Sequence, residues 1–169
     1  MTDAVQLPPP PAPGANYVPA RRSGDLLFIA GQLPFVDGRL PRTGKLGDAV
    51  DVPAGQELAR LAALNGLAVA NAALGSLATV SVVQLTVFVA STPDFTEQHL
   101  VANGASDVLI AVLGERGRHA RTAVATPVLP LDTPVEVQLV LEVGAEDEPG
   151  GPPAGARREP ASGGGQEGP

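Results

Sequence analysis

The stretch VPAGQELARLAALNGLAVANAALGSLATVSVVQLTVFVA, residues 52–90, holds the two patterns that decide the fold. From residue 52 to 74 apolar residues recur at helical spacing. Pro53 lies near the start of this stretch and Gly75 follows its end, so one long amphipathic helix is predicted. Residues 79–90 alternate instead with the period of a strand. One face of this strand is expected to hold Val83, Leu85, Val87 and Val89, and the other Gln84, Thr86 and Phe88.

The flanking segments continue the alternation of strand and helix patterns. A short apolar run at Leu26–Ala30 predicts a strand, and the glycine-rich segment 36–47 predicts a loop. A second helix is expected to begin at Pro93–Asp94 and to end near Gly114–Gly117. Two last strands are expected at Arg121–Val128 and Val135–Val143. This order predicts an α+β domain in which two helices cover one face of a sheet.

The second face of the predicted sheet is neither plainly solvated nor plainly apolar. It is expected to hold Gln84, Thr86, Phe88, Glu136, Gln138 and Val140. Because a face of this mixed composition commonly marks a subunit interface, we expect the chain to associate with copies of itself. A sedimentation mass equal to one chain at micromolar concentration would contradict this expectation.

The domain is expected to span residues 15–143, between two segments without a folding pattern. Residues 1–14 are rich in proline and residues 144–169 in Gly, Pro, Glu and Ser, so both are expected to be disordered. The proline-rich start does not resemble a signal peptide, and no apolar run reaches the length that spans a bilayer. A soluble cytoplasmic protein is therefore expected.

The composition excludes several kinds of chemistry. The chain has no cysteine, which rules out disulfides, thiolate metal sites and a cysteine nucleophile. Its two histidines are too few for a tight transition-metal site, so no metal is expected. A net charge of −7 with only 3% aromatic residues argues against nucleic-acid binding, which depends on phosphate neutralisation and base stacking.

Several short motifs, in their order and spacing, resemble the RidA (YjgF-type) family. They are Tyr17-Val18-Pro19-Ala20-Arg21, Leu27-Phe28-Ile29-Ala30-Gly31-Gln32-Leu33-Pro34, Arg121-Thr122-Ala123-Val124, Leu129-Pro130 and Val135-Glu136-Val137. The runs Val101-Ala102-Asn103-Gly104-Ala105-Ser106 and Gly117-Arg118-His119-Ala120-Arg121 look like a branch often labelled endoribonuclease L-PSP or YjgF-like. Together the motifs cover residues 15–143.

The resemblance implies a chorismate-mutase-like α+β fold, a homotrimer and a cleft between each pair of subunits. It also implies hydrolysis of reactive enamines and imines, such as 2-aminoacrylate, to 2-oxo acids and ammonia without a cofactor. Arg121 matches the arginine that holds the substrate carboxylate, and Glu136 the acidic residue fifteen positions later. Tyr17 matches the tyrosine of the N-terminal motif, and Asn103 the helix asparagine.

The residue types suit this chemistry. The planar donor fork of Arg121 fits a carboxylate and stays charged at any working pH; its alternative role is a salt bridge with Glu136 or Asp107. Glu136 is expected to activate water or to move a proton to departing ammonia, or else to be a structural partner of Arg121. His119 is two residues before Arg121 and so on the same face of a strand, where it is a candidate substrate contact or base.

Tyr17 is a candidate to cover the substrate, and its alternative is an edge residue that packs its ring. Gly31 and Gln32 are expected to border the cleft through a turn. The family often has a serine just before this Gly-Gln pair, where the chain has Ala30, and a hydroxyl that could hold substrate or water is therefore missing.

Three functions follow as hypotheses. The first is an enamine/imine deaminase, a hydrolase whose partner is a 2-imino or 2-enamino acid. The second, which Ala30 favours, is a trimer that binds a small carboxylate without turnover. The third is an endoribonuclease, against which the acidic, aromatic-poor composition argues.

Overall fold

The long helix α1, Val52–Leu74, begins and ends at its capping residues. The side chain of Asp51 accepts a hydrogen bond of 3.0 Å from the backbone N–H of Ala54, and Pro53 lies in the first turn, where its missing N–H has no intrahelical partner to lose. Gly75 ends the helix at a φ of 80°, a left-handed conformation that glycine adopts without steric cost. The prediction of a helix over residues 52–74 is confirmed.

The computed structural model describes residues 6–144 and places five strands in one sheet. The strands are β1 (Ala20–Ser23), β2 (Leu26–Gln32), β3 (Val80–Ala90), β4 (Ala120–Thr126) and β5 (Val135–Val143). Their order is β1-β2-β5-β3-β4, in which β3 and β4 are parallel and all other neighbours antiparallel. The sheet is therefore mixed.

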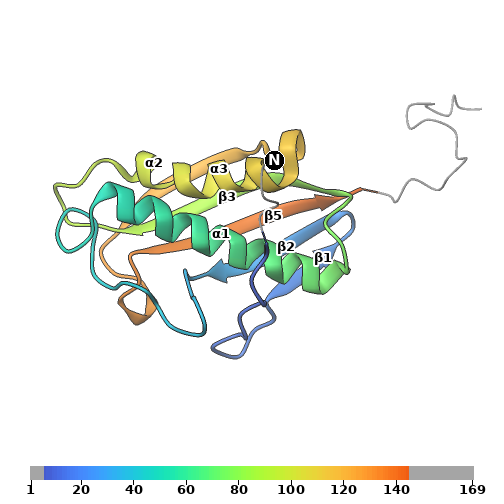
Figure 1. The fold of residues 1–169 in the computed structure, drawn as a ribbon, viewed down its shortest axis with the longest axis horizontal. Coiled ribbons are helices and arrows are strands. Elements are labelled where there is room, and N and C mark those ends of the chain that lie inside the picture. The colour runs from blue at the N-terminus through green and yellow to red at the C-terminus, as the bar shows by residue number, and fades with distance from the viewer. Residues whose placement is uncertain (1–5, 145–169) are drawn as a thin grey trace, which may run out of the picture.

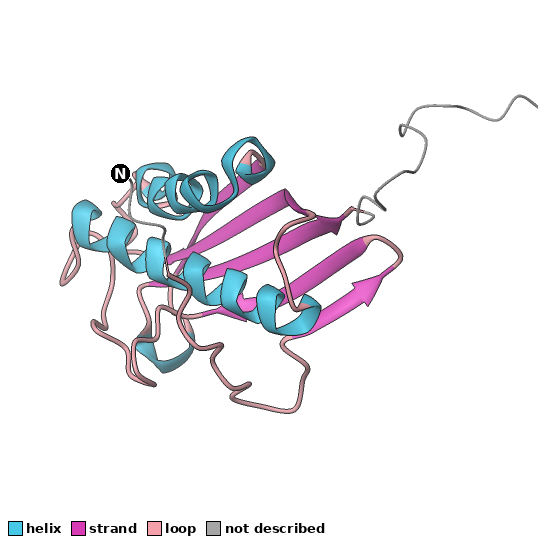
Figure 2. Cartoon of the chain, turned by 45° about the vertical axis from the view of Figure 1, so that its right-hand side comes forward, coloured by secondary structure: helices cyan, strands magenta, loops and turns pink. Residues whose placement is uncertain are grey.

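The helices lie together on one face of this sheet (Figure 1, Figure 2). The short helix α2 (Gln98–Val101) leads into α3 (Asn103–Leu113), which packs beside α1. Two single-turn 3-10 helices, η1 (Gly114–Gly117) and η2 (Pro130–Asp132), precede β4 and β5. The predicted α+β architecture, two helices on one face of a mixed sheet, is confirmed.

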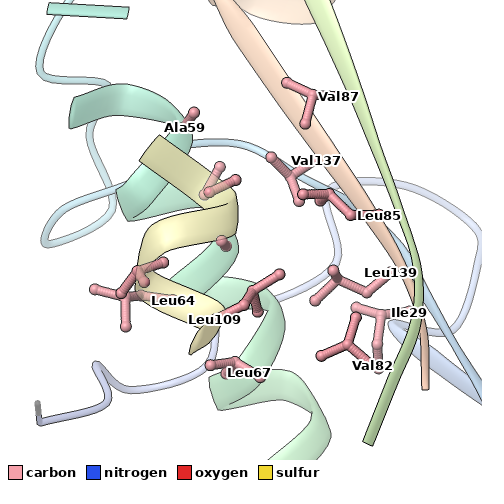
Figure 3. Packing of buried hydrophobic residues seen from close by; sticks show 14 of the residues in the cluster. Ile29, Ala59, Leu64, Leu67, Val82, Leu85, Val87, Leu109, Val137 and Leu139 are labelled. Atoms are coloured by element: carbon pink, nitrogen blue, oxygen red, sulfur yellow. The ribbon is translucent and has the colours of Figure 1, made fainter. Parts of the chain in front are cut away.

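The space between helices and sheet is filled by aliphatic side chains (Figure 3). Leu67 of α1 and Leu109 of α3 meet Leu85 and Leu139 of the central strands, and all four are at most 1% exposed. The buried cluster contains no aromatic side chain among the described residues, as the composition requires. β5 supplies its alternate valines and leucines to this core, so Glu136 must point to the opposite face.

Two sequence predictions are corrected by the structure, and one strand is added to them. Val83 does not share a face with Leu85: a register shift between Val82 and Gln84 turns it outward, where it is 42% exposed. The second helix begins at Gln98 rather than at Pro93–Asp94. The N-terminal strand β1 was not predicted, because its exposed, polar sequence has no strand-like alternation.

The sheet face away from the helices is open in the single chain and combines apolar with polar groups. Phe28 and Val124 are 41% and 37% exposed on this face, and Val140 is half-buried between Phe28 and Gln84. The mixed face that the sequence predicts is therefore present.

The two flanking segments differ in what the structure describes. Residues 6–14, expected to be disordered, form neither helix nor strand, yet Leu7 packs against the core and Pro11 is half-buried. Of the expected C-terminal tail only Gly144 is described; its N–H donates to the carbonyl of Thr79, and residues 145–169 lie outside the described part. No helix within residues 6–144 has both the length and the apolar character needed to cross a membrane.

Candidate functional site

The sequence-predicted site residues fall into two groups within one chain. The first group, the Arg121 cluster, consists of Arg121, Asn103, Ser106 and His119 with the carbonyl of His99. Arg121 lies on the edge strand β4 opposite the buried Leu85, so its side chain leaves the sheet on the helix side. There the exposed guanidinium reaches over α2 and α3.

Acceptors of its own chain hold the Arg121 guanidinium on one side. Nη1 donates to Oδ1 of Asn103 at 2.9 Å and to Oγ of Ser106 at 3.1 Å, while Nη2 donates to the carbonyl of His99 at 3.2 Å. A guanidinium carries five N–H donors. Among the described residues the Nε–H and one of the two Nη2 hydrogens have no acceptor, so donors remain from which a carboxylate can accept.

A chain of hydrogen bonds continues from Arg121 through Ser106 to His119. Oγ of Ser106 lies 3.0 Å from Nε2 of His119, and Nδ1 of the same ring lies 2.6 Å from the carbonyl of Gly117. Since that carbonyl can only accept, Nδ1 donates to it, and in the neutral form of the ring Nε2 accepts from the Ser106 hydroxyl. Both ring nitrogens of His119 are thus engaged, and His119 reaches Arg121 only through Ser106.

The second group lies around a cavity of about 590 Å³, here named the Glu136 cavity. Its wall combines the N-terminal segment, the end of β2 and the turn before β5. The lining residues are Pro11, Ala12, Pro13, Gly14, Ala15, Tyr17, Pro19, Ala30, Gly31, Gln32, Leu33, Phe35, Pro130, Leu131 and Glu136. Three of the predicted site residues, Tyr17, Gly31 and Gln32, therefore share one cavity with Glu136.

Glu136 is the single carboxyl group in this lining. It is half-buried on β5, and burial raises the pKa of its carboxyl group. Within residues 6–144 it has neither a hydrogen bond nor a salt bridge. A carboxylate that burial makes more basic and that no neighbour occupies is suited to take a proton from a ligand or a water molecule.

The remaining cavity residues shape the wall. Gln32 is buried, and its Nε2 donates to the carbonyl of Ala30 at 3.0 Å, so its side chain braces the turn. Asn65 of α1 donates to the carbonyls of Leu33 and Phe35 and fixes the same turn against the helix. Tyr17 is 47% exposed at the cavity, and its hydroxyl oxygen accepts from the N–H of Gly14 at 3.4 Å.

The two groups do not meet within one chain. Arg121 projects on the helix side of β4, whereas Glu136 is paired with Phe88 on the open face of the sheet, two strands away. The described residues form salt bridges only between Glu57 and Arg60 and between Glu115 and Arg118, so Arg121 pairs with neither Glu136 nor Asp107.

Sequence reasoning missed two residues of these groups. Ser106 lies one helical turn after Asn103, a spacing that places both on one face of α3 and that could have indicated it. Leu131 carries no such signal, because its placement at the cavity depends on a left-handed backbone with a φ of 57°. No cluster of three or more metal-binding side chains is found in residues 6–144.

Comparison with known proteins gives matches over most of the chain. A family described as YjgF/chorismate mutase-like, with endoribonuclease as a provisional label, matches residues 1–143. The protein TCP17 of Trypanosoma cruzi is 48% identical over 141 residues, which cover 82% of this chain and 88% of that protein.

Solved structures also match most of the chain. A protein of unknown function from Agrobacterium tumefaciens is 49% identical, with a TM-score of 0.75 over 77% of this chain and 83% of that one. RidA from an Antarctic Psychrobacter is 28% identical, with a TM-score of 0.58 over 83% of this chain and 99% of its own. The range of the family match includes every residue of the Arg121 cluster and of the Glu136 cavity.

Proposed function

The chain belongs to the YjgF/RidA family, and from this premise we propose that it hydrolyses reactive 2-imino acids and their enamine forms to 2-oxo acids and ammonia. The observation that carries the proposal is the half-occupied guanidinium of Arg121. Acceptors from its own chain fix its orientation, and within residues 6–144 two of its donors stay free for the carboxylate that every such substrate carries.

The proposed site forms between two copies of the chain. One subunit supplies the Arg121 cluster, and its neighbour supplies Glu136 with Tyr17 and Gly31. Two facts support this arrangement: the two groups are on opposite faces of the sheet within one chain, and the open face exposes Phe28 and Val124. We propose a homotrimer, in which three equivalent interfaces close the ring and each holds one cleft.

The reaction needs a positioned water and one proton carrier. The guanidinium holds the carboxylate, so that the adjacent imine carbon lies beside Glu136. Glu136 takes a proton from water while the water oxygen bonds to the imine carbon, and Glu136 then passes this proton to the imine nitrogen. The hydroxyl of this adduct then gives its proton, through Glu136, to the nitrogen as the carbon–nitrogen bond breaks, so ammonia leaves and a 2-oxo acid remains. Because burial raises the pKa of Glu136, its carboxylate is a stronger base than one in water.

The proposal is tested with imines generated in situ by an amino-acid oxidase. The 2-oxo acid released is measured over time, and a trapping amine reports the imine that survives. Wild type is expected to shorten the life of the imine, and Arg121→Ala to abolish the acceleration while leaving the assembly intact. Acceleration that is unchanged in Arg121→Ala would refute the assignment.

A mixing experiment tests whether the site lies between subunits. Arg121→Ala and Glu136→Gln are each expected to be inactive, yet co-expression of the two gives mixed assemblies. About a quarter of the clefts then join an intact arginine to an intact glutamate from different chains. Recovery of that share of wild-type activity supports the shared site, and no recovery at all contradicts it.

The same assay separates the two alternatives. Carboxylate binding without acceleration would favour a non-catalytic small-carboxylate-binding trimer, the alternative that Ala30 supports because it places no hydroxyl in the cavity wall. RNA cleavage that persists through purification and is lost in Arg121→Ala would favour an endoribonuclease.

A further inference from the structure

We infer that the Glu136 cavity is a subsite for a large apolar side chain, so that the preferred substrates derive from amino acids such as leucine or phenylalanine. This inference rests on the proposed function, because it assigns the side chain of the substrate whose carboxylate Arg121 holds. It sets the three-carbon acid 2-aminoacrylate among the poorer substrates.

The chemistry of the wall is the first argument. Apart from Glu136 the lining has no charged side chain, and its two other polar side chains are Gln32, whose amide donates to Ala30, and Tyr17, whose hydroxyl accepts from Gly14. Proline residues have no N–H, so the segment that contributes Pro11 and Pro13 offers few donors to a ligand. A polar substrate side chain would lose its hydration here with little compensation, whereas an apolar one gains by leaving water.

Leu131 is the second argument. It is 68% exposed at the mouth of the cavity, and both it and Asp132 have a positive φ, of 57° and 58°. A non-glycine residue in this region costs about 1 kcal/mol or more, and such strain gathers where function requires a fixed side chain. The carbonyl of Asp132 accepts from the N–H of Gly44 at 3.0 Å, which ties the strained turn to the loop before α1.

The size of the cavity is the third argument. A volume of about 590 Å³ equals that of roughly twenty water molecules in the liquid. Because Arg121 of the neighbouring subunit holds the carboxylate, the imine needs only the part beside Glu136, and most of the space remains for a side chain. Leu7 packs against the core and anchors the N-terminal segment, whose residues 11–15 form part of the cavity wall.

The test compares stable 2-oxo acids as ligands by calorimetry, which needs no turnover. The probes are pyruvate, 4-methyl-2-oxopentanoate and 5-guanidino-2-oxopentanoate. Wild type is expected to bind 4-methyl-2-oxopentanoate about tenfold more tightly than pyruvate. Leu131→Ser is expected to remove most of that difference and Leu131→Met to keep it. Val128→Ser, at a residue that is similarly exposed (62%) but outside the cavity lining, is the matched control.

The outcomes separate this inference from the proposed function. Equal binding of pyruvate and 4-methyl-2-oxopentanoate overturns the subsite even where imine hydrolysis is accelerated. Tightest binding of 5-guanidino-2-oxopentanoate, through Glu136, overturns it as well. A tenfold preference that depends on Leu131 supports the subsite even where the oxidase-coupled assay shows no acceleration, and in that case only the deaminase function fails.

Discussion

The carboxyl group of Glu136 occupies the space that a side chain at Gly31 would need. A Cβ built on Gly31 overlaps Oε1 of Glu136, and its next nearest neighbours are also atoms of that side chain. The φ of Gly31 is not positive, so the glycine is required here for close approach rather than for an unusual backbone. The position of the proposed base is thus set by the absence of a side chain on the neighbouring strand.

Gly31→Ala is expected to displace the Glu136 carboxyl group while the fold remains. The overlapping atom is the end of a flexible side chain, so the expected change in the free energy of unfolding is below about 1 kcal/mol. Activity should fall about a hundredfold, because small misplacement of a reacting group is costly. Gly14→Ala adds the same methyl group to the same cavity wall with no atom within 4 Å, and its activity should stay near wild type.

Glu136→Gln is expected to stabilise the protein at neutral pH while it abolishes activity. Burial raises the pKa of Glu136 above its ordinary value of 4.5, so the folded chain holds this proton more tightly than the unfolded chain. Its contribution to stability is full below pH 4.5 and is lost as pH rises through the raised pKa. Urea unfolding at fixed protein concentration should therefore show a gain for the variant at pH 7 that disappears below pH 4.5. A gain that is the same at both pH values would contradict this explanation.

Ser106→Ala is expected to raise KM about tenfold with little change in kcat, because it removes one of the acceptors that orient Arg121. Ser106→Thr keeps the hydroxyl group and should restore KM. His119→Ala should add little to the effect of Ser106→Ala, since His119 contacts Arg121 only through that hydroxyl. Independent, additive losses of kcat would instead place His119 on the substrate.

Local sequence patterns were sufficient to predict those helices and strands whose boundaries depend on residues within or next to the element. Helix α1 has its caps in Asp51 and Gly75, and β5 alternates without interruption over Val135–Val143. The start of the second helix was not predictable in this way. Pro93–Asp94 is typical of a helix start, but Phe95 packs against the distant core and the helix begins only at Gln98. Long-range packing overrides the local signal there.

The candidate site was predictable as a set of residues but not as an arrangement. Arg121 and Glu136 can be singled out by their match to the family motifs, and among the described residues both keep hydrogen-bonding groups available for a ligand. Their separation by two strands depends on strand order, in which β3 lies between β4 and β5. A single sequence carries no direct signal for that order, nor for the left-handed turn that presents Leu131.

Phe28→Glu tests whether the open sheet face joins the subunits. Phe28 is 41% exposed and lies opposite Arg21 of β1, so a glutamate there is tolerated in the isolated chain, where the arginine is at hand. In an assembly through this face the new carboxylate would leave water, which costs several kcal/mol for an uncompensated charge. Sedimentation should then show a fall from the mass of three chains to that of one, with loss of activity because the proposed site joins residues of two chains. Ile110→Glu on α3, where the side chain is 38% exposed on the helical layer, should leave the mass unchanged. An unchanged mass for Phe28→Glu, or loss of assembly in Ile110→Glu alone, would move the interface to the helical side and with it the partner of Arg121.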